Sequence, residues 1–363
     1  MNKRIIVFTV LIAVITGVGL ACTSAIVSGK ASKNGRPLVW KHRDTGVEDN
    51  VVARIEARND GEYDYVALYN AGDSTFRDAW LGMNEVGFAI MNTASYNLAP
   101  DTTEYKDREG IVMAMALSRC RTVEDFENML DTLPKPMGVQ ANFGLIDATG
   151  NGAYYETDDF KYTKYPLSGA ENGVLVRTNY SHCRNTDGGY GYIREANAKY
   201  LLAPYIEGDS VTAATFTENI SRSFYHSLIG RDFVDGDDRW VVDQDFIPRR
   251  SSSASVVIEG VLPGENPSLS VMWTMIGYPP CSYVVPVMVD EVPSQLQPDE
   301  ETGRSVLCDE VVARKHEVFS IKRGSGSHYL DMDLVKKYID QMKVLSLEGY
   351  EKGFKLRESK RND

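Results

Sequence analysis

The sequence predicts an α+β protein in which two antiparallel β-sheets pack face to face and helices cover the outer faces, the αββα architecture. Three observations support this fold class. Short extended segments fill most of the first 70 or so residues that follow an apolar leader. The hydrophobic period then changes to that of helices, and strand patterns return twice, with helical stretches between and after them. Strands and helices therefore come in blocks, as they do where sheets stack and helices lie outside.

The first block of strands contains two predicted hairpins. Residues 22–28 and 37–44 are extended runs separated by a polar stretch that contains glycine. A second hairpin turns at Asn84-Glu85. The remaining strands of this block are predicted at 51–57 and 63–69, and the arms of the second hairpin at 79–82 and 87–92.

Helical periodicity begins near Arg108. Thr122 and Asp125 have the spacing of a capping box, which predicts a second helix that stops before Pro134. The basic tail from residue 355 to 363 is poor in apolar residues, so we expect it to fray. The other predicted elements are strands at 142–147, 153–156, 174–179, 253–260, 268–275 and 283–289, and helices at 193–202, 211–224, 311–319 and 332–345.

The N-terminal segment has the pattern of a secretory signal peptide. Lys3 and Arg4 precede an uncharged apolar run, residues 5–20, which is shorter than the roughly 20 residues that span a bilayer. Gly19 and Ala21 are the small residues that a signal peptidase requires three and one positions before its cut. The sequence therefore predicts export, to the periplasm or the medium, with only transient membrane contact through the leader.

These patterns divide the chain into three parts. Residues 1–21 are the predicted signal peptide, residues 22–290 the sandwich domain and residues 291–363 a C-terminal helical extension. After cleavage, the mature chain begins at Cys22.

Composition excludes several classes of function. The net charge is −12 and no block of Lys and Arg stands out, which argues against a nucleic-acid partner. Five cysteines occur without a CxxC pair, and HExxH is absent, so neither a metal site nor a cofactor is expected. The expected partner is a small amide or acyl-amino substrate. A second copy of the chain, forming a homo-oligomer, remains open.

Cys22 gains its chemistry from its position. A free α-amine has a pKa of about 8, so part of it is neutral near pH 7 and accepts a proton. In a chain that begins with Cys, this amine lies within reach of its own thiol, takes the thiol proton and later delivers it to a leaving amine. Because the thiolate is the attacking form, one residue supplies both nucleophile and base. Cys22 is therefore the predicted catalytic residue.

Asp44 is the carboxylate predicted beside Cys22. If the first hairpin is centred near Lys33, Cys22 lies opposite Asp44, and cross-strand partners have Cβ atoms about 5 Å apart. Strict alternation places Lys41 on the other face unless the strand end bends, and a bulge would shift the register by one residue. The pattern therefore favours Asp44 over Lys41 as the residue that orients the nucleophile.

A competing interpretation is lipidation of Cys22. Acylation of the amine and thioether formation at the sulfur would abolish the proposed chemistry and leave a lipid-anchored binding protein, such as a surface receptor for glycans or peptides. Lipoprotein leaders usually carry a branched aliphatic residue three positions before the Cys and a small one two positions before it. Gly19 and Leu20 stand there instead, which disfavours this alternative.

The start of the mature chain, Cys22-Thr23-Ser24 with Lys41-His42-Arg43-Asp44 about twenty residues later, resembles a known group of enzymes. These are the N-terminal-nucleophile cysteine hydrolases that act on linear amide C–N bonds. They include the isopenicillin N acyltransferase family, the choloylglycine hydrolases with the penicillin V acylases, and a dipeptidase family. The resemblance covers most of residues 22 to about 290 and implies the αββα fold.

Family roles carry over to individual positions. The resemblance implies that Cys22 is the nucleophile and that Asp44 orients it. Lys41 stands where the choloylglycine hydrolases carry Arg, and we assign it to substrate binding. Asn92 and Asn179, the latter in a Thr-Asn pair, resemble the two amides that bind the oxyanion.

The late arginine of the family is matched by Arg250, with Arg249 as the alternative. Three histidines, His42, His182 and His226, suggest a Cys/His pair, but an N-terminal amine makes a histidine base unnecessary. The resemblance therefore implies an exported cysteine amidohydrolase or acyltransferase that works through a thioester on Cys22. A dipeptidase of the same superfamily and a catalytically dead relative retained as a binding module stay open. The sequence does not distinguish penicillin, bile salt, N-acyl amino acid or dipeptide as the substrate.

Overall fold

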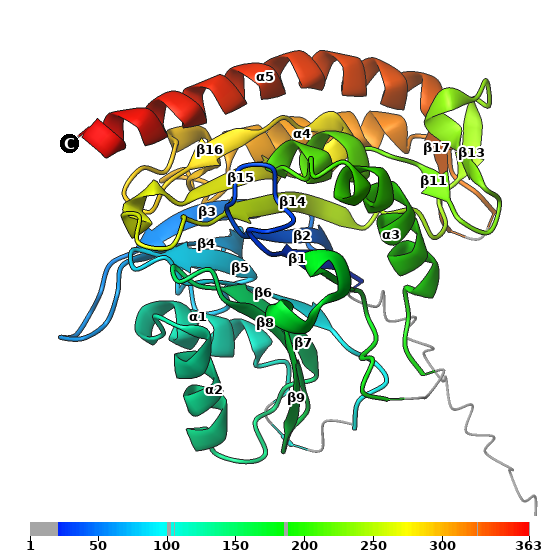
Figure 1. Cartoon of the computed structure of the whole chain (residues 1–363). Coiled ribbons are helices and arrows are strands. Elements are labelled where there is room, and N and C mark those ends of the chain that lie inside the picture. Colours follow the sequence, from blue (N-terminus) through cyan, green and yellow to red (C-terminus); the bar gives the residue numbers. More distant parts are fainter. Residues whose placement is uncertain (1–20, 100–102, 105, 185–187, 325, 363) are drawn as a thin grey trace, which may run out of the picture.

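The computed structural model describes residues 21–99, 103–104, 106–184, 188–324 and 326–362, so residues 1–20 of the predicted signal peptide lie outside the described part. Two antiparallel sheets form the centre of the molecule (Figure 1). One has the order β10 (Val174–Arg177), β1 (Thr23–Val27), β2 (Leu38–Asp44), β14 (Ser252–Glu259), β15 (Val271–Ile276) and β16 (Val285–Val287). The other follows chain order: β3 (Asn50–Ile55), β4 (Tyr65–Asn70), β5 (Leu81–Asn84), β6 (Ala89–Ala94), β7 (Ala141–Ile146), β8 (Gly152–Thr157) and β9 (Tyr162–Pro166).

Helices cover the outer face of each sheet (Figure 1). α1 (Glu109–Arg119) and α2 (Val123–Thr132) pack on the seven-stranded sheet, where Phe126 contacts Phe143. α3 (Tyr192–Glu207), a π-helical turn (Thr215–Ile220) and α5 (Met332–Asn362) cover the six-stranded sheet, and Trp273 packs against Tyr350 there. α4 (Val306–Val318) packs beside the sheets. The predicted αββα fold is therefore confirmed.

Local signals in the sequence correspond to observed structure at two points. The capping box of α2 is present: Thr122 Oγ1 accepts from Asp125 N at 3.1 Å, and the Asp125 carboxylate accepts from Thr122 N at 2.9 Å. The turn at Asn84-Glu85 joins β5 to β6 as predicted. Two small two-stranded sheets were not predicted, β11 (Tyr225–His226) with β12 (Arg231–Asp232), and β13 (Trp240–Val242) with β17 (Tyr329–Asp331).

The register of the first hairpin differs from the prediction by one residue. Thr23 pairs with His42 and Ser24 with Lys41. Ala21, rather than Cys22, therefore lies across from Asp44, and Ala21 N donates to Asp44 O at 3.3 Å.

The loop that connects β1 to β2 is held by contacts that the sequence of the hairpin does not reveal. Ser32 forms a β-bridge with Val211, and Lys33 N donates to Val211 O at 2.9 Å, so a segment outside the hairpin fixes the loop. Because side chains alternate between the two faces of a strand, a register shift of one residue changes which residues of β2 share a face with Cys22. Lys41 and Arg43 consequently point into the space between the sheets, whereas Asp44 lies on the outer face.

The last seventy residues share the cores of the sheets. Val311, Val318 and Val335 belong to the same buried cluster as the strands of the six-stranded sheet. The tail expected to fray is the end of α5 through Asn362, and Arg357 in it is buried, donating to Glu259 at 2.8 Å. That expectation was wrong because a buried ion pair fixes the basic segment. The boundary at residue 290 stays a prediction.

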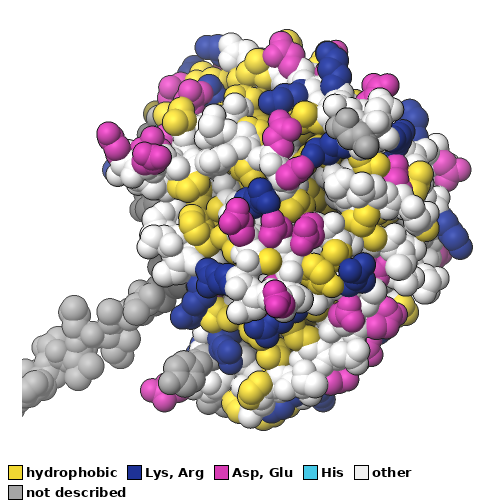
Figure 2. Space-filling model, turned by 90° about the vertical axis from the view of Figure 1, so that its left-hand side faces the viewer, with side chains coloured by type: hydrophobic (Ala, Val, Ile, Leu, Met, Phe, Trp, Pro, Cys, Tyr) yellow, Lys and Arg dark blue, Asp and Glu magenta, His cyan; other side chains and the backbone are white. Residues whose placement is uncertain are grey.

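The described residues contain neither a membrane-spanning helix nor a metal-binding cluster. None of their helices combines the length and the apolar character that crossing a membrane requires. No three of their His, Cys, Asp and Glu side chains gather in a metal-binding arrangement. On the face shown in Figure 2, acidic and basic side chains are interspersed with apolar ones.

Candidate active site

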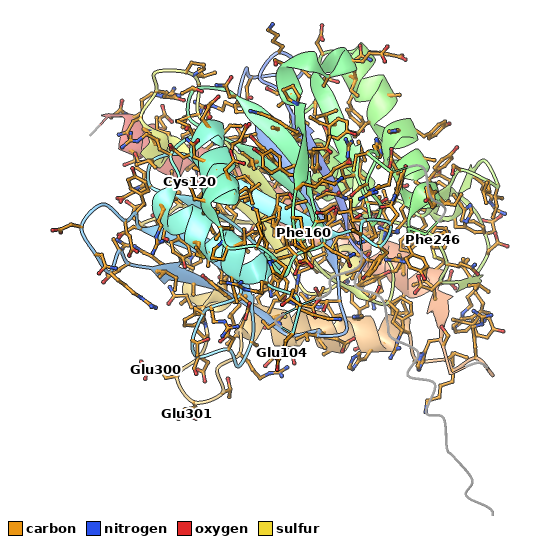
Figure 3. The ribbon with its side chains drawn as sticks, turned by 90° about the horizontal axis from the view of Figure 1, so that it is seen from below. Glu104, Cys120, Phe160, Phe246, Glu300 and Glu301 are labelled. Carbon is orange, nitrogen blue, oxygen red and sulfur yellow. The ribbon has the colours of Figure 1, made fainter. Side chains whose placement is uncertain are left out.

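Cys22 lies directly before β1, beside the end of β2, and is buried with 6% of its surface exposed. Its thiol is directed at Asp44 O, with a distance of 4.0 Å between Sγ and the oxygen. All five cysteines are free. Burial raises the pKa of the Cys120 and Cys308 thiols to about 12 and that of Cys183 to about 11. Cys120 lies at the end of α1 in the outer layer (Figure 3). These three thiols are therefore poor nucleophiles near neutral pH.

The Asp44 carboxylate is held on both oxygens. Oδ1 accepts from Ser252 Oγ at 2.5 Å, and Oδ2 accepts from Arg249 Nη2 at 2.5 Å. Arg249 Nη2 also donates to Ala21 O at 3.1 Å. Asp44 is 1% exposed, so this charge depends on its partners. The guanidinium of Arg249 joins the carboxylate to the backbone immediately before Cys22.

His42 belongs to the same cluster and is a weak base, because its ring stays neutral at neutral pH. Burial lowers its pKa to about 4, although Asp44 acts in the opposite direction. Ser252 Oγ gives its proton to Asp44 and already accepts from Arg249 N at 2.9 Å, so His42 Nε2, 2.9 Å away, must carry the hydrogen. A neutral imidazole that donates to Ser252 through Nε2 supports the carboxylate, and its lowered pKa makes its other nitrogen a weak proton acceptor.

Lys41 orients Asn92. Its Nζ donates to Asn92 Oδ1 at 2.7 Å and to Trp80 O at 2.8 Å. An ammonium has no acceptor, so the amide atom facing it must be the oxygen. Asn92 Nδ2 therefore points away from Lys41, and within the described residues no acceptor is bonded to it. The amide is ready to donate to a developing negative charge.

Burial lowers the pKa of Lys41 to about 8, while the charge of Cys22 raises it. Lys41 and Asn92 thus lie on the Cys22 side of the sheet, whereas the predicted register placed Lys41 on the opposite face.

Asn179 is tied to Cys22 through Arg194, a residue that sequence reasoning missed. Arg194 Nη2 donates to Asn179 Oδ1 at 2.7 Å, and Arg194 Nη1 donates to Cys22 O at 2.6 Å. One hydrogen of Asn179 Nδ2 is directed at Ala94 O, 2.9 Å away. Nothing local in the sequence marks an arginine in α3, more than 170 residues after Cys22, as part of this site.

The loop that carries Asn179 is held by two buried side chains, Asn142 of β7 and Glu156 of β8. Asn142 Nδ2 donates to Thr178 O at 3.1 Å, and its Oδ1 accepts from Ser181 Oγ at 2.6 Å. Glu156 accepts from the backbone N–H groups of His182 and Cys183 at 2.9 and 2.7 Å. These residues fix the position of Asn179 without contacting Cys22.

The structure does not bring Arg250 to the site. Arg250 is exposed, and its backbone N–H donates to Asp243 at 2.7 Å. The neighbouring Arg249, the alternative in the sequence, binds Asp44 instead. A tight turn decides between them, because Ser252 N donates to Arg249 O at 2.8 Å and a β-bulge follows in β14. His182 binds Glu195 at 3.1 Å and His226 is buried. Neither of these side chains is bonded to Cys22, Asp44 or Arg249.

No model of a protein family matches the chain, and no curated protein does. Solved structures do show similarity. A mutant conjugated bile acid hydrolase from Clostridium perfringens aligns with a TM-score of 0.46 at 11% identity, over 75% of this chain and 93% of that one. An N-acylethanolamine-hydrolyzing acid amidase ortholog from Caenorhabditis elegans aligns with a TM-score of 0.45 at 13% identity, over 67% and 94%. Penicillin V acylase from Agrobacterium tumefaciens aligns with a TM-score of 0.38 at 14% identity, over 75% of this chain and 87% of that one.

Proposed function

We propose that the chain is a cysteine amidohydrolase or acyltransferase that cleaves a linear amide C–N bond through Cys22. The α-amine of Cys22, freed by removal of the leader, takes the thiol proton. The sulfur then attacks the amide carbonyl, and the oxyanion accepts from Asn92 and Asn179. When the C–N bond breaks, the Cys22 ammonium returns the proton to the leaving amine and a thioester remains. Water or a second amine then releases the acyl group.

The observation that carries this proposal is the environment of the first mature residue. Asp44 and Arg249 bind the backbone on the N-terminal side of Cys22, Arg194 binds its carbonyl, and Lys41 orients an amide on the same side of the sheet. A buried structural cysteine needs none of these partners, because a thiol packs as a small apolar group. The backbone oxygen of Asp44 and the guanidinium of Arg249 both bond to Ala21, and we infer that the ammonium formed when Ala21 is removed takes its place and is oriented by the Asp44 carboxylate.

A turnover assay tests the reaction. The mature protein beginning at Cys22 is incubated with conjugated bile salts, penicillin V, N-acyl amino acids, N-acylethanolamines and dipeptides. We expect turnover of at least one class and an acyl adduct on Cys22 in the intact mass. Cys22→Ala and Cys22→Ser, with the same N-terminus, should abolish both. Cys120→Ser is the matched control, because that thiol lies in the outer layer, and it should retain activity. Undiminished turnover in Cys22→Ala would refute the proposal.

Export and partners form part of the same proposal. We propose that the leader directs the chain to the periplasm or the medium, and that the substrate is a small amide rather than a nucleic acid. Intact mass and N-terminal sequencing of the exported protein test this directly. The expected result is a chain that starts at an unmodified Cys22. A diacylglyceryl mass on Cys22 would instead support the lipid-anchored binding protein.

A further inference from the structure

Three buried cationic side chains surround Cys22. Lys41 and Arg43 are 3% exposed and Arg194 is 1% exposed. Among the described residues, none of the three forms an ion pair with a carboxylate; they donate to carbonyl, amide and hydroxyl oxygens. Burial lowers the pKa of all three side chains. The charge of Cys22 raises the pKa of Lys41 and Arg43, and Asp44, followed by Cys22, raises that of Arg194. Buried cations without a carboxylate are unfavourable, so another anion should belong among them.

Arg194 differs from the other two in its contacts. One guanidinium donates to Cys22 O at 2.6 Å, to Thr23 Oγ1 at 2.9 Å and to Asn179 Oδ1 at 2.7 Å. The first two contacts fix the nucleophile residue and the start of β1. The third fixes the oxygen of an oxyanion amide, and thereby the direction of its N–H bonds. A planar guanidinium holds several acceptors at set angles, which an ammonium cannot do.

The local structure accommodates Arg194 at a cost to the helix. It occupies the first turn of α3, where the helix dipole disfavours positive charge. The residue before α3 is Gly191, with φ of 93°, and a Cβ there would lie 2.3 Å from Arg194 Nη2 and 2.9 Å from Thr178 Cβ. Any side chain at position 191 would therefore displace the guanidinium. The start of α3 therefore accepts an unfavourable charge and requires glycine at position 191, and both features accommodate Arg194.

We infer that Arg194 is a positioning residue that couples Cys22 to Asn179. It sets the distance between the nucleophile and one oxyanion amide, and its positive charge favours the thiolate over the thiol. The inference rests on the proposed function for the turnover step, whereas its effect on the thiol stands independently of any substrate.

Two readouts test the inference on the mature protein. The first is the rate at which iodoacetamide alkylates Cys22 at pH 7, followed by peptide mass. The second is the pair kcat and KM on an amide that the wild type cleaves. Arg194→Met should slow alkylation about tenfold or more, because a nearby buried charge is lost. It should lower kcat about 100-fold with little change in KM, because the reacting groups are misplaced.

Two further variants separate charge from geometry. Arg194→Lys should restore much of the alkylation rate but less of kcat. Gly191→Ala keeps the charge and displaces the guanidinium, so it should lower kcat more than it slows alkylation. Arg222→Met is the structural control, because Arg222 is 2% exposed and pairs with Glu218 away from Cys22; its alkylation rate should match the wild type.

The outcomes distinguish this inference from the proposed function. A folded Arg194→Met that alkylates and turns over like the wild type would overturn the inference and leave the proposed function intact. A wild type that cleaves no amide, but whose Cys22 alkylation falls in Arg194→Met, would count against the proposed function and support the influence of Arg194 on the thiol.

Discussion

The two ends of strands β2 and β14 each carry a buried carboxylate with arginines, yet they balance charge differently. At one end, Glu259 accepts from Arg357 Nη1 and Asn34 Nδ2, both at 2.8 Å, and from Trp273 Nε1 at 2.9 Å. Arg36 lies 3.8 Å from the same carboxylate and also pairs with Glu265. Both buried cations at this end therefore have a carboxylate partner.

The Cys22 end has an excess of positive charge. Asp44 pairs with Arg249, whereas Lys41, Arg43 and Arg194 have no carboxylate partner among the described residues. A balanced buried cluster can be explained by structure alone, because each charge offsets another. An unbalanced cluster implies an anion that comes and goes, and the thiolate and the oxyanion of acyl transfer are such anions. The difference supports the proposal that the Cys22 end is the functional one.

The largest expected effect is on stability at the balanced end. Glu259→Gln removes the charge that Arg36 and Arg357 share, so the free energy of unfolding should fall by about 3–5 kcal/mol. Urea unfolding at pH 7 measures it. The alkylation rate of Cys22 in the folded variant should be unchanged, because this cluster lies at the other end of the strands. A variant of normal stability with slower alkylation would contradict the comparison.

The next effect concerns acid stability at the Cys22 end. Burial lowers the pKa of His42 to about 4, so between pH 6.5 and 4 the folded state binds fewer protons than the unfolded state. The stability contributed by the neutral ring is present above pH 6.5 and is lost as the pH falls toward 4. His42→Asn should reduce this loss, by about 3 kcal/mol at most, in urea titrations at a series of pH values. Identical acid sensitivity in both proteins would show that His42 is not buried as the neutral form.

A third effect separates the role of Lys41 from that of a generic cation. Lys41→Met should lower kcat about 100-fold, because Asn92 loses the partner that orients its amide. Since burial lowers the pKa of Lys41 to about 8, activity should decline as the pH rises through that value. Lys41→Arg should recover part of kcat and move the alkaline limb of the pH profile upward, because arginine stays protonated. If the alkaline limb of the Lys41→Arg profile stays at the wild-type pH, the limb belongs to a group other than Lys41.

The smallest expected effect is at the rim of the balanced end. Arg361 pairs with Glu265 at 2.7 Å, but its side chain is 56% exposed. Exposed pairs of this kind contribute about 0.2–1 kcal/mol, so Arg361→Ala should shift the urea midpoint only slightly. A loss comparable to that of Glu259→Gln would mean that the balance extends to the surface, and would weaken the distinction between the buried cluster and its rim.

Much of the fold could be predicted from local patterns, because strand alternation, the turn at Asn84-Glu85 and the capping box of α2 are written in neighbouring residues. The register of the first hairpin could not, since Val211 fixes its loop from almost 180 residues away. The tail after residue 355 also escaped prediction, because its order depends on Arg357 reaching Glu259 on a distant strand.

The candidate site divides in the same way. Cys22 and Asp44 could be named from the cut position and the resemblance, and the structure places them next to each other. The preference for Asp44 over Lys41 rested on the wrong register, which hid the contact of Lys41 with Asn92. Arg250 was chosen over Arg249 because a bulge and a turn are invisible in the sequence. Arg194 could not be found, because only tertiary packing brings α3 to Cys22.

The most direct measurement compares the mature chain that starts at Cys22 with a form that keeps one more residue, Ala21. In the longer form, Ala21 stays bonded to Asp44 and Arg249, so the sulfur and its surroundings are retained while the α-amine becomes an amide. The account predicts that the mature chain turns over its amide substrate and that the longer form loses this activity, although its Cys22 still reacts with iodoacetamide. Equal turnover by the two forms would contradict the claim that the amine of Cys22 is the base.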